Sequence, residues 1–402
     1  MESFPTADEL LVQVPAESMQ TLLASHRHHA SPLGSSIPAL DDHVSSLNSQ
    51  QPTPLRRGDV VEIQGPAASG KSHLLYHLLT TCVLPVAHHS VCIGGWECAA
   101  VLLDTDGKFN IKRFRRLLTS RLSKLRVTQD TALPAVDDQT LEDILGLCLS
   151  RLHVFRPSSS AQLAATLVHL PDYHSTHPSL RSHEIGLLAI DSLSAFYWGD
   201  RFLVEQWRTT SGNAASTTPI PTELASPMRH VVAAVQRVRA LRGPLTVLTN
   251  WGLNPSKRPA DLGEQAYPLY KQHLHPFPAP FDTTVATALP PRIRPVPAQP
   301  QTSAGPVCPT EGQDAFEPSG SSETRQLFSI THHITLYPSL AEPYPASLTL
   351  SEIKGDSHPS SVIAPHTVTH QGLVRTPASV LATRFAFRVT EDDIVFEPSA
   401  EV

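Results

Sequence analysis

Residues 59–72, which read DVVEIQGPAASGKS, decide the expected fold of this 402-residue chain. Their last eight residues fit the pattern G-x-x-x-x-G-K-[ST], which is the signature of a phosphate-binding loop. Residues 59–64 predict a β-strand that enters the loop, and residues 72–84 (SHLLYHLLTTCVL) predict a helix that leaves it. Because both flanking elements are predicted, a phosphate-binding loop is favoured over a glycine-rich turn that matches the pattern by chance.

The loop is expected to bind a nucleotide mainly through its backbone. Its two glycines permit a tight turn, so that successive N–H groups can point at the β-phosphate, and the helix N-terminus adds favourable partial charge. Lys71 should reach the β- and γ-phosphates, and the Ser72 hydroxyl should bind Mg²⁺. The expected cofactors are ATP and Mg²⁺, and the candidate cofactor-binding residues are Gly65, Pro66, Ala67, Ala68, Ser69, Gly70, Lys71 and Ser72.

A second metal-binding residue is expected at Asp191, which ends the apolar run IGLLAID (185–191). Such a run is typical of a strand buried on both faces of a parallel sheet. A carboxylate at the tip of a strand beside the loop would hold Mg²⁺ through its water shell. The alternative is a helix-capping role for Asp191, together with Ser192 or Ser194.

Apolar strands and helices alternate along the rest of the chain, which predicts an α/β fold with a doubly wound, mostly parallel sheet. Further strands are predicted at residues 99–104, 151–156, 185–191, 244–250, 327–337 and 347–353, and further helices at residues 110–126, 141–150, 161–170 and 226–243. Residues 384–398 (RFAFRVTEDDIVFEP) predict a C-terminal β-hairpin that turns at residues 391–393.

Four regions are predicted. Residues 1–50 are a polar N-terminal segment that is expected to be largely disordered, and residues 51–252 form the ATP-binding core. Residues 253–325 carry thirteen prolines between positions 254 and 309 and predict a disordered insertion, and residues 326–402 supply strands that complete the core. Residues 208–222 predict a polar loop within the core.

The composition limits the class of protein. A net charge of −6 requires any nucleic-acid surface to be a local patch. Five cysteines without a CxxC pair favour a reducing compartment over a disulfide framework. No apolar run approaches the roughly 18 residues that span a bilayer, and no basic-then-apolar leader follows Met1. We therefore expect a soluble intracellular protein that does not associate with a membrane.

Three stretches resemble the eukaryotic RecA-like recombinase paralogues. They are GDVVEIQGPAASGKSHLLYHLLTTCVLP (58–85), GGWECAAVLLDTDGKFNIKRFRRLL (94–118) and GLLAIDSLSAFYWGDR (186–201), and the resemblance extends roughly over residues 56–250 and to RFAFRVTEDDIVFE (384–397). The resemblance implies a RecA-like P-loop NTPase core without an N-terminal DNA-binding domain. It also implies nuclear work in homologous-recombination repair of DNA double-strand breaks, on single-stranded or branched DNA, in a heteromeric complex with other paralogues.

Two residues depart from the pattern of active RecA-type enzymes. Asp106, the one candidate catalytic residue, stands where those enzymes carry a glutamate that orients the attacking water. Its side chain is shorter, and a general base must lie within about 2.6–3.2 Å of its proton or act through a water; the alternative is a turn residue in T-D-G. Trp251 replaces a glutamine that senses the γ-phosphate, and it has no carbonyl acceptor. Both changes favour ATP binding with weak or absent hydrolysis; the alternative is a DNA-dependent ATPase that forms its own filament.

Candidate DNA and partner surfaces are less specific. Seven basic residues on the helix predicted at 110–126 could contact phosphates or form a solvated face: Lys112, Arg113, Arg115, Arg116, Arg121, Lys124 and Arg126. The resemblance places two DNA-binding loops at residues 199–225 and 252–325. The aromatic run FYW (196–198) is interpreted as core and subunit interface, and no group of histidines has zinc-ligand spacing.

Overall fold

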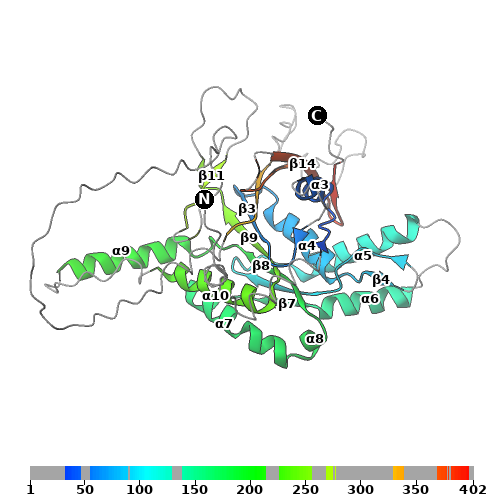
Figure 1. The fold of residues 1–402 in the computed structure, drawn as a ribbon, viewed down its shortest axis with the longest axis horizontal. Helices are drawn as coiled ribbons and strands as arrows, with labels where there is room; N and C mark the ends of the chain where they lie inside the picture. The colour runs from blue at the N-terminus through cyan, green and yellow to red at the C-terminus, as the bar shows by residue number, and fades with distance from the viewer. Residues whose placement is uncertain are drawn as a thin grey trace, which may run out of the picture.

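The computed structural model describes residues 32–46, 55–88, 91–128, 138–213, 226–255, 269–274, 277, 329–338, 369–377, 379 and 382–397. These residues form one large sheet with helices on both of its faces (Figure 1). The strand predicted at residues 347–353 and most of the proline-rich insertion lie outside the described residues. No helix within the described ranges is long and apolar enough to cross a membrane.

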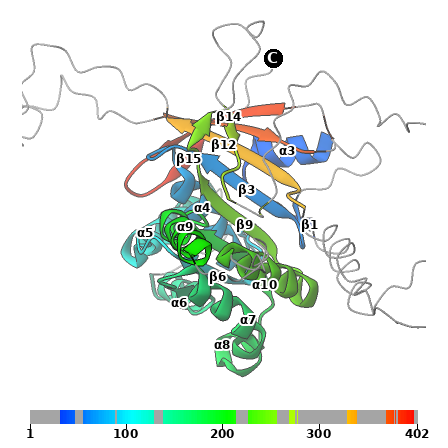
Figure 2. The ribbon, with the colours of Figure 1, turned by 90° about the vertical axis from the view of Figure 1, so that its left-hand side faces the viewer.

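The central sheet has nine strands in the order β15-β14-β13-β12-β3-β9-β8-β6-β7. They are β3 (Val60–Gly65), β6 (Ala99–Asp104), β7 (Leu152–Phe155), β8 (Ile185–Asp191), β9 (Leu245–Trp251), β12 (His332–Pro338), β13 (Thr369–Arg375), β14 (Ala382–Val389) and β15 (Ile394–Phe396). The six strands from β12 to β7 pair in parallel, and β12 to β15 continue as an antiparallel extension. Figure 2 shows the strands following one another across the sheet from β14 to β9. The predicted mostly parallel sheet and C-terminal hairpin are therefore confirmed.

Helices cover both faces of the sheet, as the doubly wound prediction requires. They are α3 (Pro38–Ser46), α4 (Lys71–Val83), α5 (Ile111–Thr128), α6 (Asp138–Ser150), α7 (Ser160–Thr176), α8 (Pro178–Arg181), α9 (Tyr197–Asn213) and α10 (Pro227–Arg242). The leucines of α4 pack in one buried cluster with residues of α5, α6 and α3, and α7 and α10 contribute to a second buried cluster. Gly243, in the left-handed conformation at φ 58°, ends α10.

The strand sequences explain why the core has two halves. Alternate residues of a strand point to opposite faces of the sheet. In β6, Ala100 and Leu102 join the cluster around α4, whereas Val101 and Leu103 join the cluster around α7 and α10. A strand that is buried on both sides has no polar face, which is why these strands read as continuous apolar runs.

Residues 32–46 of the N-terminal segment, which was predicted to be largely disordered, are folded against the core. Residues 32–33 form β1, which pairs with β2 (Leu55–Arg56), and residues 38–46 form α3. Ile37 and Leu40 are completely buried in the cluster around α4. The apolar residues between 33 and 44 are too few to predict a helix from periodicity alone, but tertiary packing buries them. Residues 1–31 and 47–50 lie outside the described residues.

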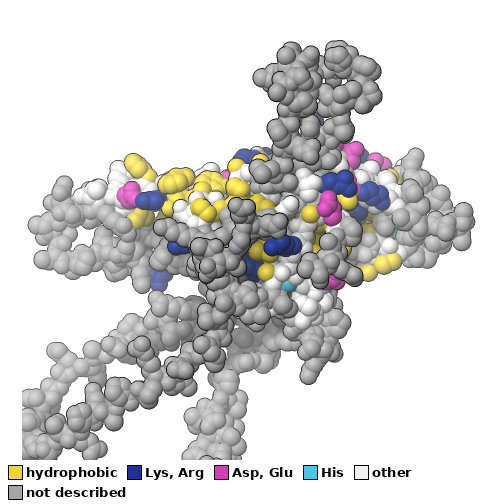
Figure 3. Space-filling model, turned by 90° about the horizontal axis from the view of Figure 1, so that it is seen from above, with side chains coloured by type: hydrophobic (Ala, Val, Ile, Leu, Met, Phe, Trp, Pro, Cys, Tyr) yellow, Lys and Arg dark blue, Asp and Glu magenta, His cyan; other side chains and the backbone are white. Residues whose placement is uncertain are grey.

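The segments after β8 and β9 also differ in detail from the predictions. Helix α9 extends to residue 213 and so includes part of the polar loop predicted at 208–222. Phe196 and Tyr197 pack against the core, but Trp198 is 57% exposed, together with Phe202 and Leu203. Figure 3 shows hydrophobic side chains gathered at the left of the view, which is the end of the molecule where α9 lies. Within the insertion, β10 (Asn254–Pro255) pairs with β11 (Tyr270–Lys271); a further pair is formed by β4 (Ala87–His88) and β5 (Val91–Cys92).

Candidate nucleotide-binding site

The glycine loop, which we define as residues 65–72, connects β3 to α4 and lies at the C-terminal edge of the parallel strands. Gly70 has a backbone φ of 93°, a conformation that residues other than glycine rarely adopt, and Ala68 has a positive φ of 59°. A Cβ on Gly70 would lie 2.8 Å from Cζ of Phe387, and a Cβ on Gly65 would lie 2.3 Å from the carbonyl oxygen of Leu336. The loop therefore needs both glycines, because C-terminal strands pack directly beneath it.

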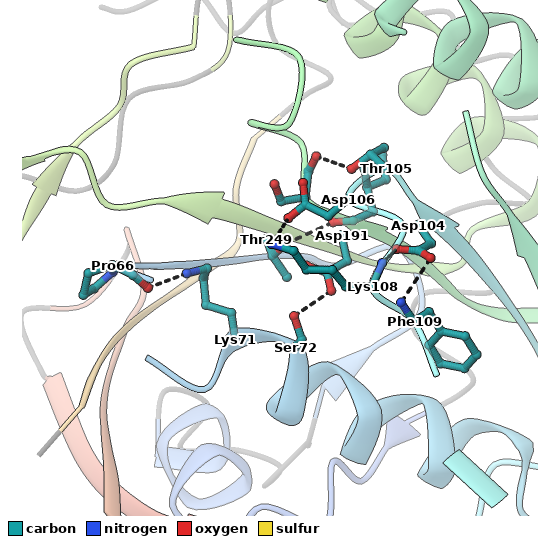
Figure 4. A network of polar contacts seen from close by, with 12 residues as sticks. Pro66, Lys71, Ser72, Asp104, Thr105, Asp106, Lys108, Phe109, Asp191 and Thr249 are labelled. Carbon is teal, nitrogen blue, oxygen red and sulfur yellow. Dashed lines mark hydrogen bonds and ion pairs between the residues drawn. The ribbon is translucent and has the colours of Figure 1, made fainter. Parts of the chain in front are cut away.

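Lys71 extends along the loop toward its beginning (Figure 4). Its Nζ donates hydrogen bonds to the carbonyl oxygens of Gly65 at 2.9 Å and Pro66 at 2.7 Å. Burial lowers the pKa of Lys71 to about 8, although Asp191 and Asp106 oppose this shift. The ammonium is thus held at the mouth of the loop, where the motif places a phosphate-binding lysine.

Ser72 and Asp191 meet across the intervening strand β9. Ser72 Oγ donates a hydrogen bond of 2.8 Å to Asp191 Oδ2, and Thr249 Oγ1 on β9 donates one of 2.6 Å to Asp191 Oδ1. Burial raises the pKa of Asp191, and these two hydrogen bonds oppose the rise. The structure therefore brings together the two residues predicted to bind the metal. Thr249 was missed, although the sequence places it at the end of a predicted strand.

The turn after β6 presents Asp106 to the same site. The N–H groups of Thr105 and Asp106 donate to the carbonyl oxygen of Asp191 at 2.9 and 3.3 Å, which ties the turn to the end of β8. Asp106 Oδ2 lies 3.5 Å from Nζ of Lys108. The carboxylate is thus close to the site, as predicted, but it faces a cation of its own turn.

Trp251 follows Asn250 at the end of β9 and is partly buried. The backbone N–H of Trp251 donates to Ser194 Oγ at 3.0 Å, and the Ser194 hydroxyl donates to Asn250 Oδ1 at 3.2 Å. Asn250 in turn donates to Glu62, a fully buried carboxylate on β3. The backbone of the residue that replaces the glutamine therefore belongs to a buried polar network.

The basic face of α5 is mostly engaged within the fold. Arg116 forms an ion pair with Glu391, and Lys124 forms one with Asp393, both in the turn between β14 and β15. Arg113 donates to the carbonyl oxygen of Thr390 at 3.1 Å. Two further side chains are paired elsewhere: Arg115 with Glu142, and Arg121 with Thr81 and Ser36. These five residues therefore have partners within the fold, and phosphate contact by this face stays a prediction.

The residues present fit a magnesium–nucleotide complex. Ser69 Oγ is buried inside the glycine loop and has no hydrogen-bond partner in the described structure. The loop has no room for a side chain at Gly65 or Gly70, as is expected where backbone N–H groups must surround a phosphate. Among the described residues, no group of three or more His, Cys, Asp or Glu could hold a metal. A magnesium ion would therefore depend on Ser72, Asp191 and the phosphates themselves.

Comparisons with known proteins agree with the fold. No protein-family model matches the chain. The chain is 38% identical over 144 residues to "DNA repair protein XRCC2" of Mus musculus, a match that covers 36% of this chain and 43% of the mouse protein. It is 28% identical over 163 residues to "DNA repair protein XRCC2 homolog" of Arabidopsis thaliana, covering 37% and 44% of the two chains. It is also 28% identical over 138 residues to "DNA repair protein RAD51 homolog 3" of Cricetulus griseus, covering 33% and 34%.

The mixed α/β fold, with its large parallel sheet and flanking helices, is that of a RecA-like core. Within this class, the chain is homologous to the XRCC2 proteins, which confirms the resemblance to eukaryotic RecA-like recombinase paralogues. The chain aligns with less than half the length of these curated relatives. The names of all three relatives describe them as DNA repair proteins.

Proposed function

We propose that this protein binds Mg²⁺·ATP at the glycine loop and assists homologous-recombination repair of DNA double-strand breaks within a heteromeric complex of recombinase paralogues. The observation that carries the nucleotide part is the convergence of Lys71, Ser72 and Asp191 at one end of the sheet. Lys71 would contact the β- and γ-phosphates, and Ser72 and Asp191 would hold the metal. When bound, the ion neutralises phosphate charge and orients the triphosphate.

We expect hydrolysis to be weak or absent. A general base must have a free carboxylate directed at the attacking water. Asp106 is shorter than the glutamate of active enzymes, and Lys108 lies beside its carboxylate. Trp251 provides no side-chain acceptor for sensing the γ-phosphate. General-base assistance typically contributes about 10²–10⁴ in rate, so its loss would leave bound ATP largely unhydrolysed.

The homology to XRCC2 proteins and to a RAD51 homologue supports other recombinase paralogues as partners and the nucleus as the place of action. Single-stranded or branched DNA is the expected nucleic acid. Since most of the basic face of α5 is paired within the fold, the protein would contact DNA elsewhere, in the loops predicted at 199–225 and 252–325.

The test has two measurements on the full chain. The first is purification from cell extract followed by mass spectrometry, in which we expect recombinase paralogues as stoichiometric partners. The second is steady-state ATPase activity with single-stranded DNA, in which we expect little turnover. Turnover like that of an active recombinase that is abolished by Lys71→Ala, together with filaments of the protein alone on DNA, would support the alternative of a competent DNA-dependent ATPase.

A further inference from the structure

The turn at residues 105–110 is rigidly attached to the candidate site. Asp104, which is buried, accepts hydrogen bonds from the N–H groups of Lys108 at 3.0 Å and Phe109 at 3.1 Å. Thr105 Oγ1 donates to the carbonyl oxygen of Ser192 at 2.6 Å, in addition to the bonds that the turn makes to Asp191. Gly107, at φ 65°, allows the chain to reverse. The backbone of Lys108 is therefore fixed relative to Asp191.

The side chain of Lys108 lies over the metal-binding pair. Figure 4 shows it reaching back from the turn, across Ser72 and Asp191, toward Asp106. Its Nζ is 3.5 Å from Asp106 Oδ2, and its side chain is 78% exposed, against 20% for Asp106. The ammonium is thus paired with one carboxylate and remains accessible from solvent.

The two lysines of the site act on one another. Lys108 contributes to lowering the pKa of Lys71, whereas Asp106 opposes this shift. Two positive charges on one side of an anion-binding loop repel each other in the absence of an anion. A polyphosphate between them would relieve that repulsion.

The position of Lys108 indicates which phosphate it would meet. The N–H groups of a glycine loop surround the inner phosphates, and a metal held by Ser72 and Asp191 would neutralise the charge of the outer phosphates. Lys108 approaches the Ser72–Asp191 pair from the turn after β6, whereas the glycine loop follows β3, and its side chain extends from that turn toward Lys71 (Figure 4). A cation at this place faces the terminal phosphate.

We propose that Lys108 is a second phosphate-binding lysine, which Asp106 positions over the Ser72–Asp191 pair so that it contacts the γ-phosphate of bound ATP. This inference rests on the proposed ATP binding. It assigns Asp106 the role of a positioning residue, in place of a water-activating base. It also makes the site selective for triphosphates over diphosphates.

The experiment is equilibrium binding of fluorescent ATP and ADP analogues, with Mg²⁺, to the full-length protein and to Lys108→Ala. A charge-assisted hydrogen bond to phosphate is lost in the variant, so we expect about a tenfold weaker affinity for ATP and less than a twofold change for ADP. Lys108→Arg should recover most of the ATP affinity. Lys112→Ala, a change of another lysine near the start of α5, is the matched control and should leave both affinities unchanged.

The outcomes separate the inference from the proposed function. Equal losses for ATP and ADP, or no loss, in Lys108→Ala would overturn the role of Lys108, while ATP binding by the unmodified protein that disappears in Lys71→Ala would leave the proposed function standing. A protein that binds neither nucleotide would overturn both. Because Lys108 is exposed, the variant should keep the melting temperature of the unmodified protein, and this is measured in parallel.

Discussion

Ser72 and Asp191 are 119 positions apart in the sequence, yet Ser72 Oγ donates a hydrogen bond of 2.8 Å to Asp191 Oδ2. The contact joins the first turn of α4 to the end of β8 and leaves one carboxylate oxygen to Thr249. A serine hydroxyl and a carboxylate at this distance form a pair that a hydrated magnesium ion can bind. The arrangement makes the metal dependence of nucleotide binding testable.

Asp191→Asn should weaken ATP binding in the presence of Mg²⁺ by about tenfold, because the neutral amide loses its electrostatic attraction for the ion. Asparagine can still accept from Ser72 or Thr249, so the fold should be kept. The measurement is a titration with a fluorescent ATP analogue with Mg²⁺ and with EDTA. Removal of Mg²⁺ should weaken ATP binding by the unmodified protein and have little further effect on ATP binding by the variant. An equally large loss of affinity with EDTA in both proteins would contradict a metal role for Asp191.

Gly70→Ala should abolish nucleotide binding and destabilise the protein. The substitution places a Cβ at φ 93° and 2.8 Å from the ring of Phe387. Gly94→Ala is a matched control, because Gly94 also has a positive φ, 76°, but a Cβ there meets nothing within 4 Å. The control should lose only about 1–2 kcal/mol of folding stability, which is the cost of a side chain in the left-handed conformation. It should bind ATP normally. Urea unfolding and nucleotide titration measure the two effects; equal behaviour of both variants would contradict the packing of C-terminal strands under the loop.

Loss of the α5 ion pairs should affect stability slightly and DNA binding not at all. Arg116→Ala and Lys124→Ala remove contacts with Glu391 and Asp393. Exposed ion pairs contribute about 0.2–1 kcal/mol each, so the double variant should show a small decrease in melting temperature. A change of about two in the slope of log affinity against log salt, measured on single-stranded DNA by anisotropy, would show instead that these residues contact phosphates.

The stability of the fold should decrease as the pH falls below about 6.5. His43 on α3 is buried between the hydroxyls of Thr383, 2.8 Å from Nδ1, and Thr376, 2.9 Å from Nε2. Burial, with a smaller effect of His332, lowers the pKa of His43 from 6.5 to about 4. The unfolded chain therefore takes up a proton between pH 6.5 and 4 that the folded protein does not, so stability rises with pH across this window.

His43→Gln should flatten this dependence, since glutamine does not titrate and can still bond to a threonine hydroxyl. The measurement is the midpoint of urea unfolding at several pH values between 7 and 4.5. Burial also lowers the pKa values of His73 and His153 to about 4, so part of the pH dependence of stability should remain in the variant. The same slope with and without His43 would show that α3 is not packed on the C-terminal strands as described.

The sequence predicts most of the parallel core because strands such as β6 and β8 are continuous apolar runs that end in a carboxylate. The glycine loop and Asp191 follow from the same pattern. Helix α3 could not be predicted in this way, because nine residues with two aspartates do not form a stable helix alone. Only its packing against β14 and α4 makes it part of the fold.

Other parts of the site depend on contacts between distant segments, which composition and periodicity do not encode. His370 and Phe387 support Gly70 from strands that follow the glycine loop by some three hundred residues, and neither stands in a recognisable motif. The basic stripe of α5 was correctly predicted as a stripe, but its ion partners lie in the C-terminal hairpin turn. A charge pattern on one helix specifies neither its partner nor whether it has one.

The most direct test of the central claim is the equilibrium binding of a non-hydrolysable ATP analogue with Mg²⁺ to the full-length protein and to Lys71→Ala. We predict saturable binding of one nucleotide per chain that is lost in the variant, since the ammonium beside Gly65 and Pro66 is removed. Absence of binding to the unmodified protein, or equal binding to the variant, would contradict the claim.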